Sequence, residues 1–148
     1  MIFMKKNLLL LLLLITGLCA RSQTFTVVNN SKTVVYFQIF ASDKNSCNKK
    51  FSSMVAIADP SSTIVYGKTS EIKWSGELPG IAAEYSAFKG TYTDPSGACV
   101  SEASNVIGDD KCKTDSNAII NTAKCGGTGG NLNLSWSSKN GNVLVTIN

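Results

Sequence analysis

The stretch Asn131-Leu-Asn-Leu-Ser-Trp-Ser-Ser-Lys-Asn-Gly-Asn-Val-Leu-Val-Thr-Ile-Asn148 decides the fold class of this chain. Apolar and polar residues alternate on both sides of Asn140-Gly141, a dipeptide typical of a two-residue hairpin turn. Such a turn pairs Trp136 with Val145 and Leu134 with Ile147. A shift by one residue would place polar side chains opposite these apolar ones, so the sequence predicts a β-hairpin with one buried face.

Further strands are expected upstream, because short runs rich in Val, Ile, Thr and aromatic residues lie between turn signals such as Asp59-Pro60. The expected strands are residues 24–28, 33–40, 54–57, 63–66 and 70–74. The first two are predicted to form a hairpin through Asn30-Ser31, and the second is apolar enough for burial on both faces. Residues 81–93 fit a strand or a helix, and their alternation favours a strand.

One short helix is predicted from Ser116 to Lys124, since Asp115 or Ser116 can cap its start and Gly126 can end it. With no heptad, repeat or linker, the expected fold is mainly β. It is a single antiparallel β-sandwich with one short helix and a disulfide-braced loop, spanning residues 23–148.

Residues 1–22 have the layout of a signal peptide: two lysines, a leucine-rich run and small residues before a cleavage point after Ser22. The apolar run is too short for a membrane-spanning helix. Cys19 raises the alternative of a lipoprotein, but Leu18 stands where lipoprotein leaders prefer a small residue. We expect a secreted or periplasmic protein.

Four cysteines remain after the leader, an even number that predicts two disulfides in an exported chain. They are Cys47, Cys99, Cys112 and Cys125. A four-thiolate zinc site would bring close Cys-x-x-Cys pairs, which this spacing lacks. Three pairings are open; Cys112 with Cys125 and Cys47 with Cys99 is preferred because it needs only one long loop closure.

The charge balance narrows the function classes. The whole chain carries a formal charge of +4, but removal of residues 1–22 leaves 11 lysines against 10 acids, with no His and no Arg. Serine triads, Cys-His pairs, His-ligated zinc and Arg clamps on phosphate are therefore excluded. Dispersed lysines make no basic stripe, so nucleic acid is not expected as a partner. Membrane association is not indicated, because no long amphipathic segment is present.

Candidate ligand-binding residues are few. Trp74 lies between Lys73 and Ser75 ahead of a Pro-Gly turn, and it is the aromatic residue most compatible with exposure; Lys73 and Tyr92 are the other candidates. A calcium site is conceivable at Asp109, Asp110, Asp115 and Asn117, but their spacing differs from an EF-hand and lysines interleave, which favours a solvated loop. The Gly-rich run 126–130 precedes a strand rather than a helix, so it predicts a connector and not a phosphate or cofactor site.

No catalytic residues are predicted. Glu71 and Glu77 could form the carboxylate pair of a glycoside hydrolase, but so could other surface acids. Ser138-Lys139 would point to opposite faces of a strand. These observations favour a protein that is not an enzyme.

The opening Thr24-Phe-Thr-Val-Val-Asn-Asn-Ser31, followed by Thr33-Val34, resembles the first two strands of thaumatin-like proteins. It is similar as well to small bacterial secreted β-sandwich proteins and, to a lesser degree, to aegerolysins. The resemblance implies a secreted β-sandwich. It does not carry over glucan binding, because thaumatin-like proteins have many more disulfides, a cysteine where Ser31 stands here, and an acidic cleft partnered by Arg.

The sequence as a whole predicts an exported binding or interaction module for a surface ligand or a protein, reached through loops near Trp74 and residues 94–130. A membrane-active lytic protein and a carboxylate-based glycoside hydrolase are the alternatives.

Overall fold

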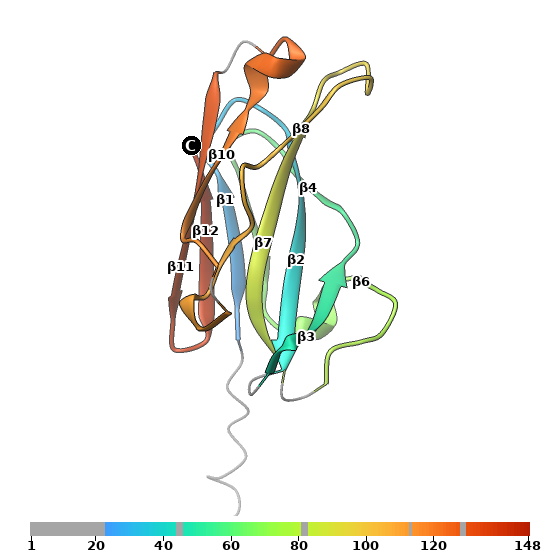
Figure 1. Cartoon of the computed structure of the whole chain (residues 1–148), viewed down its shortest axis with the longest axis vertical. Helices are drawn as coiled ribbons and strands as arrows, with labels where there is room; N and C mark the ends of the chain where they lie inside the picture. Colours follow the sequence, from blue (N-terminus) through green and yellow to red (C-terminus); the bar gives the residue numbers. More distant parts are fainter. Residues whose placement is uncertain (1–22, 44–45, 81–82, 113, 128–129) are drawn as a thin grey trace, which may run out of the picture.

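The computed structural model describes residues 23–43, 46–80, 83–112, 114–127 and 130–148. Two β-sheets pack face to face in these residues and form a sandwich (Figure 1). Within these described ranges, helical structure is confined to three short 3₁₀ turns, η1 (Thr69–Glu71), η2 (Asp110–Cys112) and η3 (Thr122–Cys125). None of the helices found there has the length and apolar character that crossing a membrane requires. The expected signal peptide lies outside the described residues.

The first sheet has five strands. In spatial order they are β10 (Asn117–Asn121), β11 (Asn131–Lys139), β12 (Asn142–Ile147), β1 (Phe25–Asn29) and β5 (Ser62–Tyr66). The pairing is antiparallel except between β1 and β12, which run parallel. β12 is therefore the central strand of this sheet.

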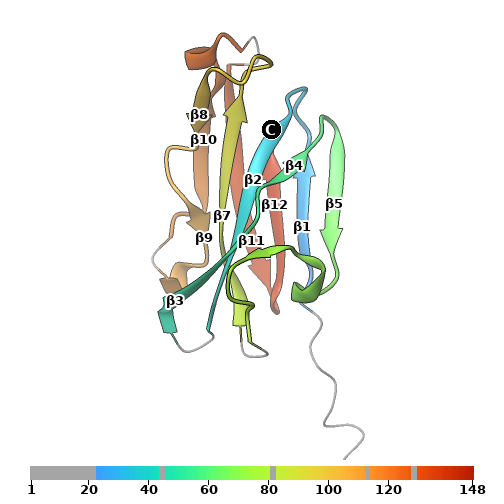
Figure 2. The same ribbon diagram turned by 90° about the vertical axis from the view of Figure 1, so that its right-hand side faces the viewer.

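The second sheet is built around the long strands β2 and β7. Its strands are β6 (Trp74–Ser75), β3 (Ser46–Ser53), β2 (Val35–Asp43), β7 (Ala83–Thr93) and β8 (Val100–Glu102), with β4 (Ala56–Ala58) paired to β2 and β9 (Ile107–Gly108) paired to β7. Figure 2 shows β4 and β5 side by side at one margin of the sandwich, where the chain crosses between the sheets.

The C-terminal hairpin is confirmed with its predicted register, since Trp136 lies opposite Val145 and Leu134 opposite Ile147. The predicted N-terminal hairpin is wrong. β1 pairs with β12 and β5 in one sheet, whereas β2 belongs to the other sheet. Apolar residues matched in either register there, so the sequence pattern could not distinguish a hairpin from a crossover.

The expected burial of residues 33–40 on both faces is also wrong. Val35, Phe37 and Ile39 are buried, whereas the residues between them are only half-buried because no further layer of the described residues covers the outer face of β2. Strand structure over 83–93 is confirmed by β7, while residues 81–82 lie outside the described part.

The predicted helix from Ser116 to Lys124 is also wrong over most of its length. Residues Asn117–Asn121 form strand β10, which pairs with β11, and only η3 is helical. Ala118 and Ile120 are buried while Ile119 is 45% exposed, so the burial has the period of a strand. Gly126 does end the helical turn, with φ of 71° in the left-handed region.

The core lies between the sheets and centres on the ring of Phe25. Its centroid is 4.9 Å from that of Tyr85, 5.7 Å from that of Trp136 and 6.4 Å from that of Phe88, and Phe88 stacks on Phe37 at 5.3 Å. These contacts join strands from both sheets, and each adds packing energy of about 0.5–1.5 kcal/mol beyond burial.

Two disulfides brace opposite ends of the sandwich, and the preferred pairing from the sequence is wrong. Cys47 is bonded to Cys112 and Cys99 to Cys125, with Cα separations of 5.5 Å and 5.4 Å. The first joins the start of β3 to η2, and the second joins the start of β8 to the end of η3. Disulfides are typical of an oxidising environment outside the cytosol.

Candidate functional site

A hollow on the described surface lies at the end of the sandwich where three connections meet. They are the β1–β2 connection, the β7–β8 turn and the segment around η3, which lie together at the top of Figure 1. The hollow has a volume of about 530 Å³, within the range of small-molecule sites. Its lining residues are Lys32, Thr33, Val34, Tyr36, Tyr92, Thr93, Asp94, Pro95, Ser96, Gly97, Thr122 and Gly127.

The β1–β2 wall is held by Asn29, which is fully buried. Its Nδ2 donates hydrogen bonds to the carbonyl oxygens of Thr33 at 2.8 Å and Ala58 at 3.0 Å. Its Oδ1 accepts from the Ser31 backbone N–H at 3.1 Å and from the Ser31 hydroxyl at 2.7 Å. A buried amide with its donors and acceptor occupied fixes the connection in one conformation. The sequence alone predicts only a turn here.

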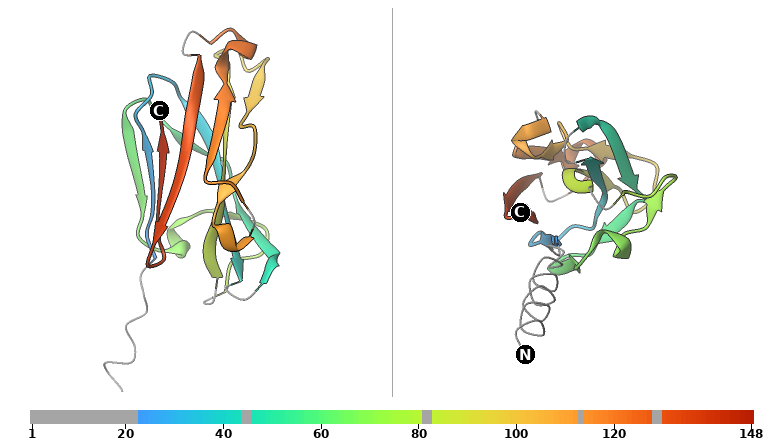
Figure 3. Two further views of the ribbon diagram at one scale, coloured as in Figure 1. Left: turned by 60° about the vertical axis from the view of Figure 1, so that its left-hand side comes forward. Right: turned by 90° about the horizontal axis from the view of Figure 1, so that it is seen from below.

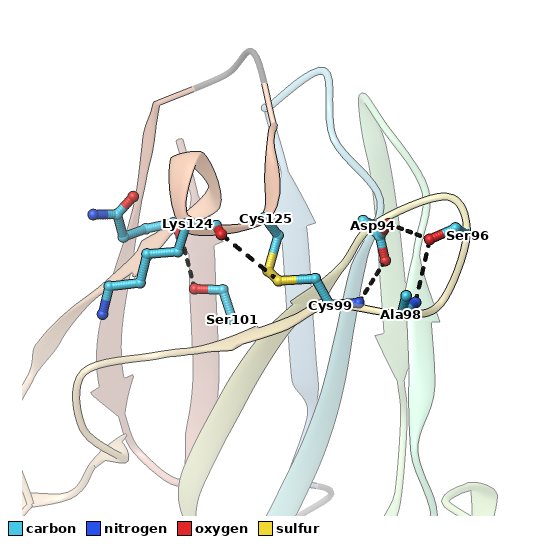
Figure 4. Close-up of a disulfide and its surroundings, with 8 residues drawn as sticks. Asp94, Ser96, Ala98, Cys99, Ser101, Lys124 and Cys125 are labelled. Atoms are coloured by element: carbon cyan, nitrogen blue, oxygen red, sulfur yellow. Dashed lines mark hydrogen bonds between the residues drawn. A yellow bond between two sulfur atoms is a disulfide. The ribbon is translucent and has the colours of Figure 1, made fainter.

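The β7–β8 wall is organised by Asp94 (Figure 4). Its carboxylate accepts hydrogen bonds from the Ser96 hydroxyl and from the Cys99 backbone N–H, the latter at 2.8 Å. Gly97 closes the turn with a left-handed φ of 74° and donates its N–H to the Asp94 carbonyl at 2.9 Å. The hydrogen bond from Ser96, followed by that from Cys99, lowers the pKa of Asp94. This carboxylate is therefore ionised at neutral pH and occupied by its own turn.

The third wall is tied to the second by the Cys99–Cys125 disulfide (Figure 4). Beside it, the Ser101 hydroxyl donates to the Asn121 carbonyl at 2.7 Å. The Thr122 hydroxyl donates to the Gly130 carbonyl, which closes the loop that follows η3. The walls of the hollow are thus preorganised by covalent and hydrogen bonds, which lowers the entropic cost of binding.

The lining combines hydroxyl groups with two tyrosine rings. Thr33, Thr93 and Ser96 contribute hydroxyls, Tyr36 is half-buried and Tyr92 is 8% exposed. One lysine and one aspartate complete the lining, so the formal charge of the lining residues is zero. Such a surface offers hydrogen-bond donors and acceptors together with the half-buried ring of Tyr36, whereas the Tyr92 ring is largely buried.

The three residues predicted to bind ligand do not form one site. Tyr92 lines the loop hollow, whereas Lys73 lines a separate hollow. Trp74 is 9% exposed, and its indole N–H donates to the Thr69 carbonyl at 2.8 Å, so the exposure predicted for it is wrong. Tyr36 was missed because a tyrosine within an apolar run looks like a core residue.

The second hollow lies between the β3–β4 connection and residues 66–73, and it is smaller, at about 170 Å³. Glu71 is at its margin, with Oε2 accepting the Gly67 backbone N–H at 2.6 Å. The nearby Tyr85 hydroxyl is buried and has no hydrogen-bond partner. Burial, and secondarily the Glu71 charge and Tyr66, raise the pKa of Tyr85 well above its ordinary value.

The candidate calcium ligands serve local roles. Asp109 Oδ1 accepts the Lys111 backbone N–H at 3.0 Å, and Asp115 accepts a hydrogen bond from the Asn105 side chain. The Asn117 side-chain amide donates to the Ser116 hydroxyl at 3.1 Å. The side chain of Asp110 lies outside the described part. Among the residues that were described, no group of three or more His, Cys, Asp or Glu side chains could hold a metal ion.

The fold and its loop hollow define a disulfide-braced β-sandwich with a preformed concave surface at one end. Comparison with protein-family models, with curated proteins and with solved structures finds no match to this chain. The resemblance of the first two strands to thaumatin-like proteins stays a prediction, and function rests on the site itself.

Proposed function

We propose that this protein is an exported binding module that takes a neutral, hydroxyl-rich ligand, of the saccharide class, into the loop hollow. The observation that carries the proposal is the lining: hydroxyls and the half-buried ring of Tyr36 around a volume of about 530 Å³, with no net charge. Sugars are recognised by aromatic faces packed on their apolar C–H surfaces and by hydrogen bonds to their hydroxyls.

Export is part of this proposal. The signal-peptide layout of residues 1–22 and the two disulfides both favour a location outside the cytosol, where extracellular saccharides are available.

The hydrolase alternative has less support in this hollow. Glycoside hydrolysis by the usual route needs two carboxyl groups across the scissile bond. Asp94 is the one acid among the described residues of the lining, and its oxygens accept hydrogen bonds from its own turn. Binding without chemistry is the function that this arrangement favours.

Two matched variants test the site. Tyr36→Phe and Tyr66→Phe remove the same hydroxyl from half-buried tyrosines in the two different hollows. Binding is measured by glycan-array screening followed by calorimetric titration of the best saccharide. We expect Tyr36→Phe to weaken binding by about 3- to 10-fold, the effect of one hydrogen bond, and Tyr66→Phe to leave it unchanged.

Backbone amide shifts give a second measurement. Saccharide titration should move the amide resonances of residues 31–36 and 92–97 and leave those near Lys73 in place. Equal effects of both tyrosine variants, or shifts centred on the second hollow, would contradict the proposal. Dye release from vesicles would favour the lytic alternative, and release of reducing sugar that Glu71→Gln abolishes would favour the hydrolase.

A further inference from the structure

The outer face of the five-stranded sheet is uncovered by any other layer of the described structure, as the left view of Figure 3 shows. The residues that point outward from β10, β11, β12, β1 and β5 are Thr, Ser, Asn, Val, Leu and Ile, and the one charged residue among them is Lys139, beside the hairpin turn. Soluble surfaces usually carry about 25–35% charged residues. This face is therefore unusual in its lack of charge.

The register brings these residues into continuous rows across the sheet. One row contains Asn117, Ser135, Thr146, Val28 and Thr63, each directly opposite the next. The next row is formed by Ser137, Leu144, Thr26 and Val65. Leu144 on the central strand is 41% exposed and Val65 at the edge is 59% exposed. The rows thus combine hydroxyl and amide groups with exposed apolar side chains.

The outer face of the seven-stranded sheet differs. There Lys89 on β7 forms an ion pair with Glu102 on β8, with Nζ and Oε2 2.6 Å apart. Covering that face would remove charged groups from water, which is costly. Covering the five-stranded face removes no charged group from water between the margins of that face. Depletion of charged residues is a compositional signal of the core of protein interfaces.

We propose that this face packs against the same face of a second copy of the chain, forming a two-fold dimer with sheets stacked face to face. In a two-fold contact both copies present the same face, so a face that carried charges of one sign would meet like charges on its partner. A face whose one charged residue, Lys139, lies at its margin is compatible with itself in this way. Because its residues include no aromatic side chain and only this one cation, it does not match a saccharide or a nucleic acid.

The available area supports a dimer of modest affinity. Five strands about 4.8 Å apart span about 24 Å, and their mean length of six residues spans about 20 Å. Two such faces bury about 1,000 Å² in projection, the lower limit for a specific interface. We therefore expect a weak dimer that forms at high protein concentration. The face is separate from the loop hollow, so this inference is independent of the proposed function.

Sedimentation velocity of residues 23–148, which contain every strand of the described structure, tests the dimer at about 1–500 μM. We expect the mean mass to rise from monomer to dimer over this range. Leu144→Lys places a cation at the centre of the face and should weaken association at least about tenfold. Thr91→Lys on the outer face of β7 is the matched control and should leave association unchanged.

Mixing the Leu144→Lys and Leu144→Glu chains should restore association as a heterodimer, because opposite charges then meet across the contact. Circular dichroism confirms that both variants fold. The proposal is overturned if the unmodified chain stays monomeric at all concentrations, or if Thr91→Lys weakens association as much as Leu144→Lys. It is also overturned if the face instead retains a neutral polysaccharide that Leu144→Lys releases.

Discussion

The Cys99–Cys125 disulfide gives the sharpest test of how this fold is held together. Replacing both cysteines with serine removes the bond without leaving a free thiol. The bond closes a loop with a sequence separation of 26. Loop-closure entropy for that length corresponds to about 3.5 kcal/mol at 25 °C. Since total stability of a domain is typically about 5–15 kcal/mol, this is a large fraction.

The assay is urea unfolding followed by circular dichroism, with the melting temperature as a second measurement. With an unfolding entropy of about 2.1 cal/mol/K per residue over the 126 residues after the leader, a loss of 3.5 kcal/mol lowers the melting temperature by about 13 °C. The matched control is the Cys47→Ser, Cys112→Ser double variant. Its sequence separation of 65 predicts a larger loss, about 4.3 kcal/mol.

The connectivity itself can be read from tryptic peptides, because lysines separate all four cysteines. The expected crosslinked products join residues 90–111 to 125–139 and residues 45–49 to 112–113. A peptide joining 112–113 to 125–139 would refute the pairing. A loss below about 1 kcal/mol in the Cys99→Ser, Cys125→Ser variant would refute the entropic reasoning even if the pairing were right.

Substitutions at Gly108, Tyr85 and Asp94 test a close contact, a buried hydroxyl and a hydrogen-bonded carboxylate. Gly108→Ala would place a Cβ 2.1 Å from the Ser86 carbonyl oxygen, so it should lower the free energy of unfolding in urea by about 2–3 kcal/mol. The control Gly80→Ala, where a Cβ would have no atom within 4 Å, should change this free energy little. Equal losses in the two variants would contradict the argument. Tyr85→Phe removes a buried hydroxyl without a partner and should raise stability by about 1 kcal/mol at pH 7. Because burial raises the folded-state pKa of Tyr85, the unmodified chain should lose stability as pH rises above about 10, where tyrosine in the unfolded chain ionises. The Tyr85→Phe variant should lose less stability over the same pH range. Parallel pH profiles of the two chains would refute the argument. Hydrogen bonds lower the folded-state pKa of Asp94, so the ionised carboxylate stabilises the fold above its unfolded pKa of about 3.8, and this stabilisation is lost as pH falls through the lower folded value. Asp94→Asn should therefore reduce the free energy of unfolding at pH 7 but not at about pH 2. An equal deficit at both pH values would disprove the ionic origin.

Strand structure near the C-terminus was predictable because local and long-range requirements agree there. Asn140-Gly141 fixes the turn, and alternation on both sides admits one register, which β11 and β12 adopt. The same kind of evidence was absent at Asn30-Ser31, where several registers match. The chain there crosses from one sheet to the other, and buried Asn29 holds the crossing.

The candidate site was only partly predictable. Tyr92 and residues 94–97 were expected to contribute to ligand binding, and they line the loop hollow. The polar neighbours of Trp74 suggest that it is exposed. Residues beside it in the sequence, however, do not reveal which parts of the fold pack over it. Tyr36 and Thr122, far apart in the chain, meet at the hollow only because β2 and η3 end at the same side of the sandwich.

By itself, the sequence determined the mainly β fold class, the C-terminal hairpin and the presence of two disulfides, because these depend on local periodicity, turn chemistry and an even count of cysteines. Only the tertiary structure decided which cysteines pair, that Asn117–Asn121 is a strand, and that one sheet face carries Lys139 as its one charged residue. Each of these depends on which segments become neighbours. Neighbours are chosen by packing around Phe25 and its partners, whose contacts connect residues more than 50 positions apart.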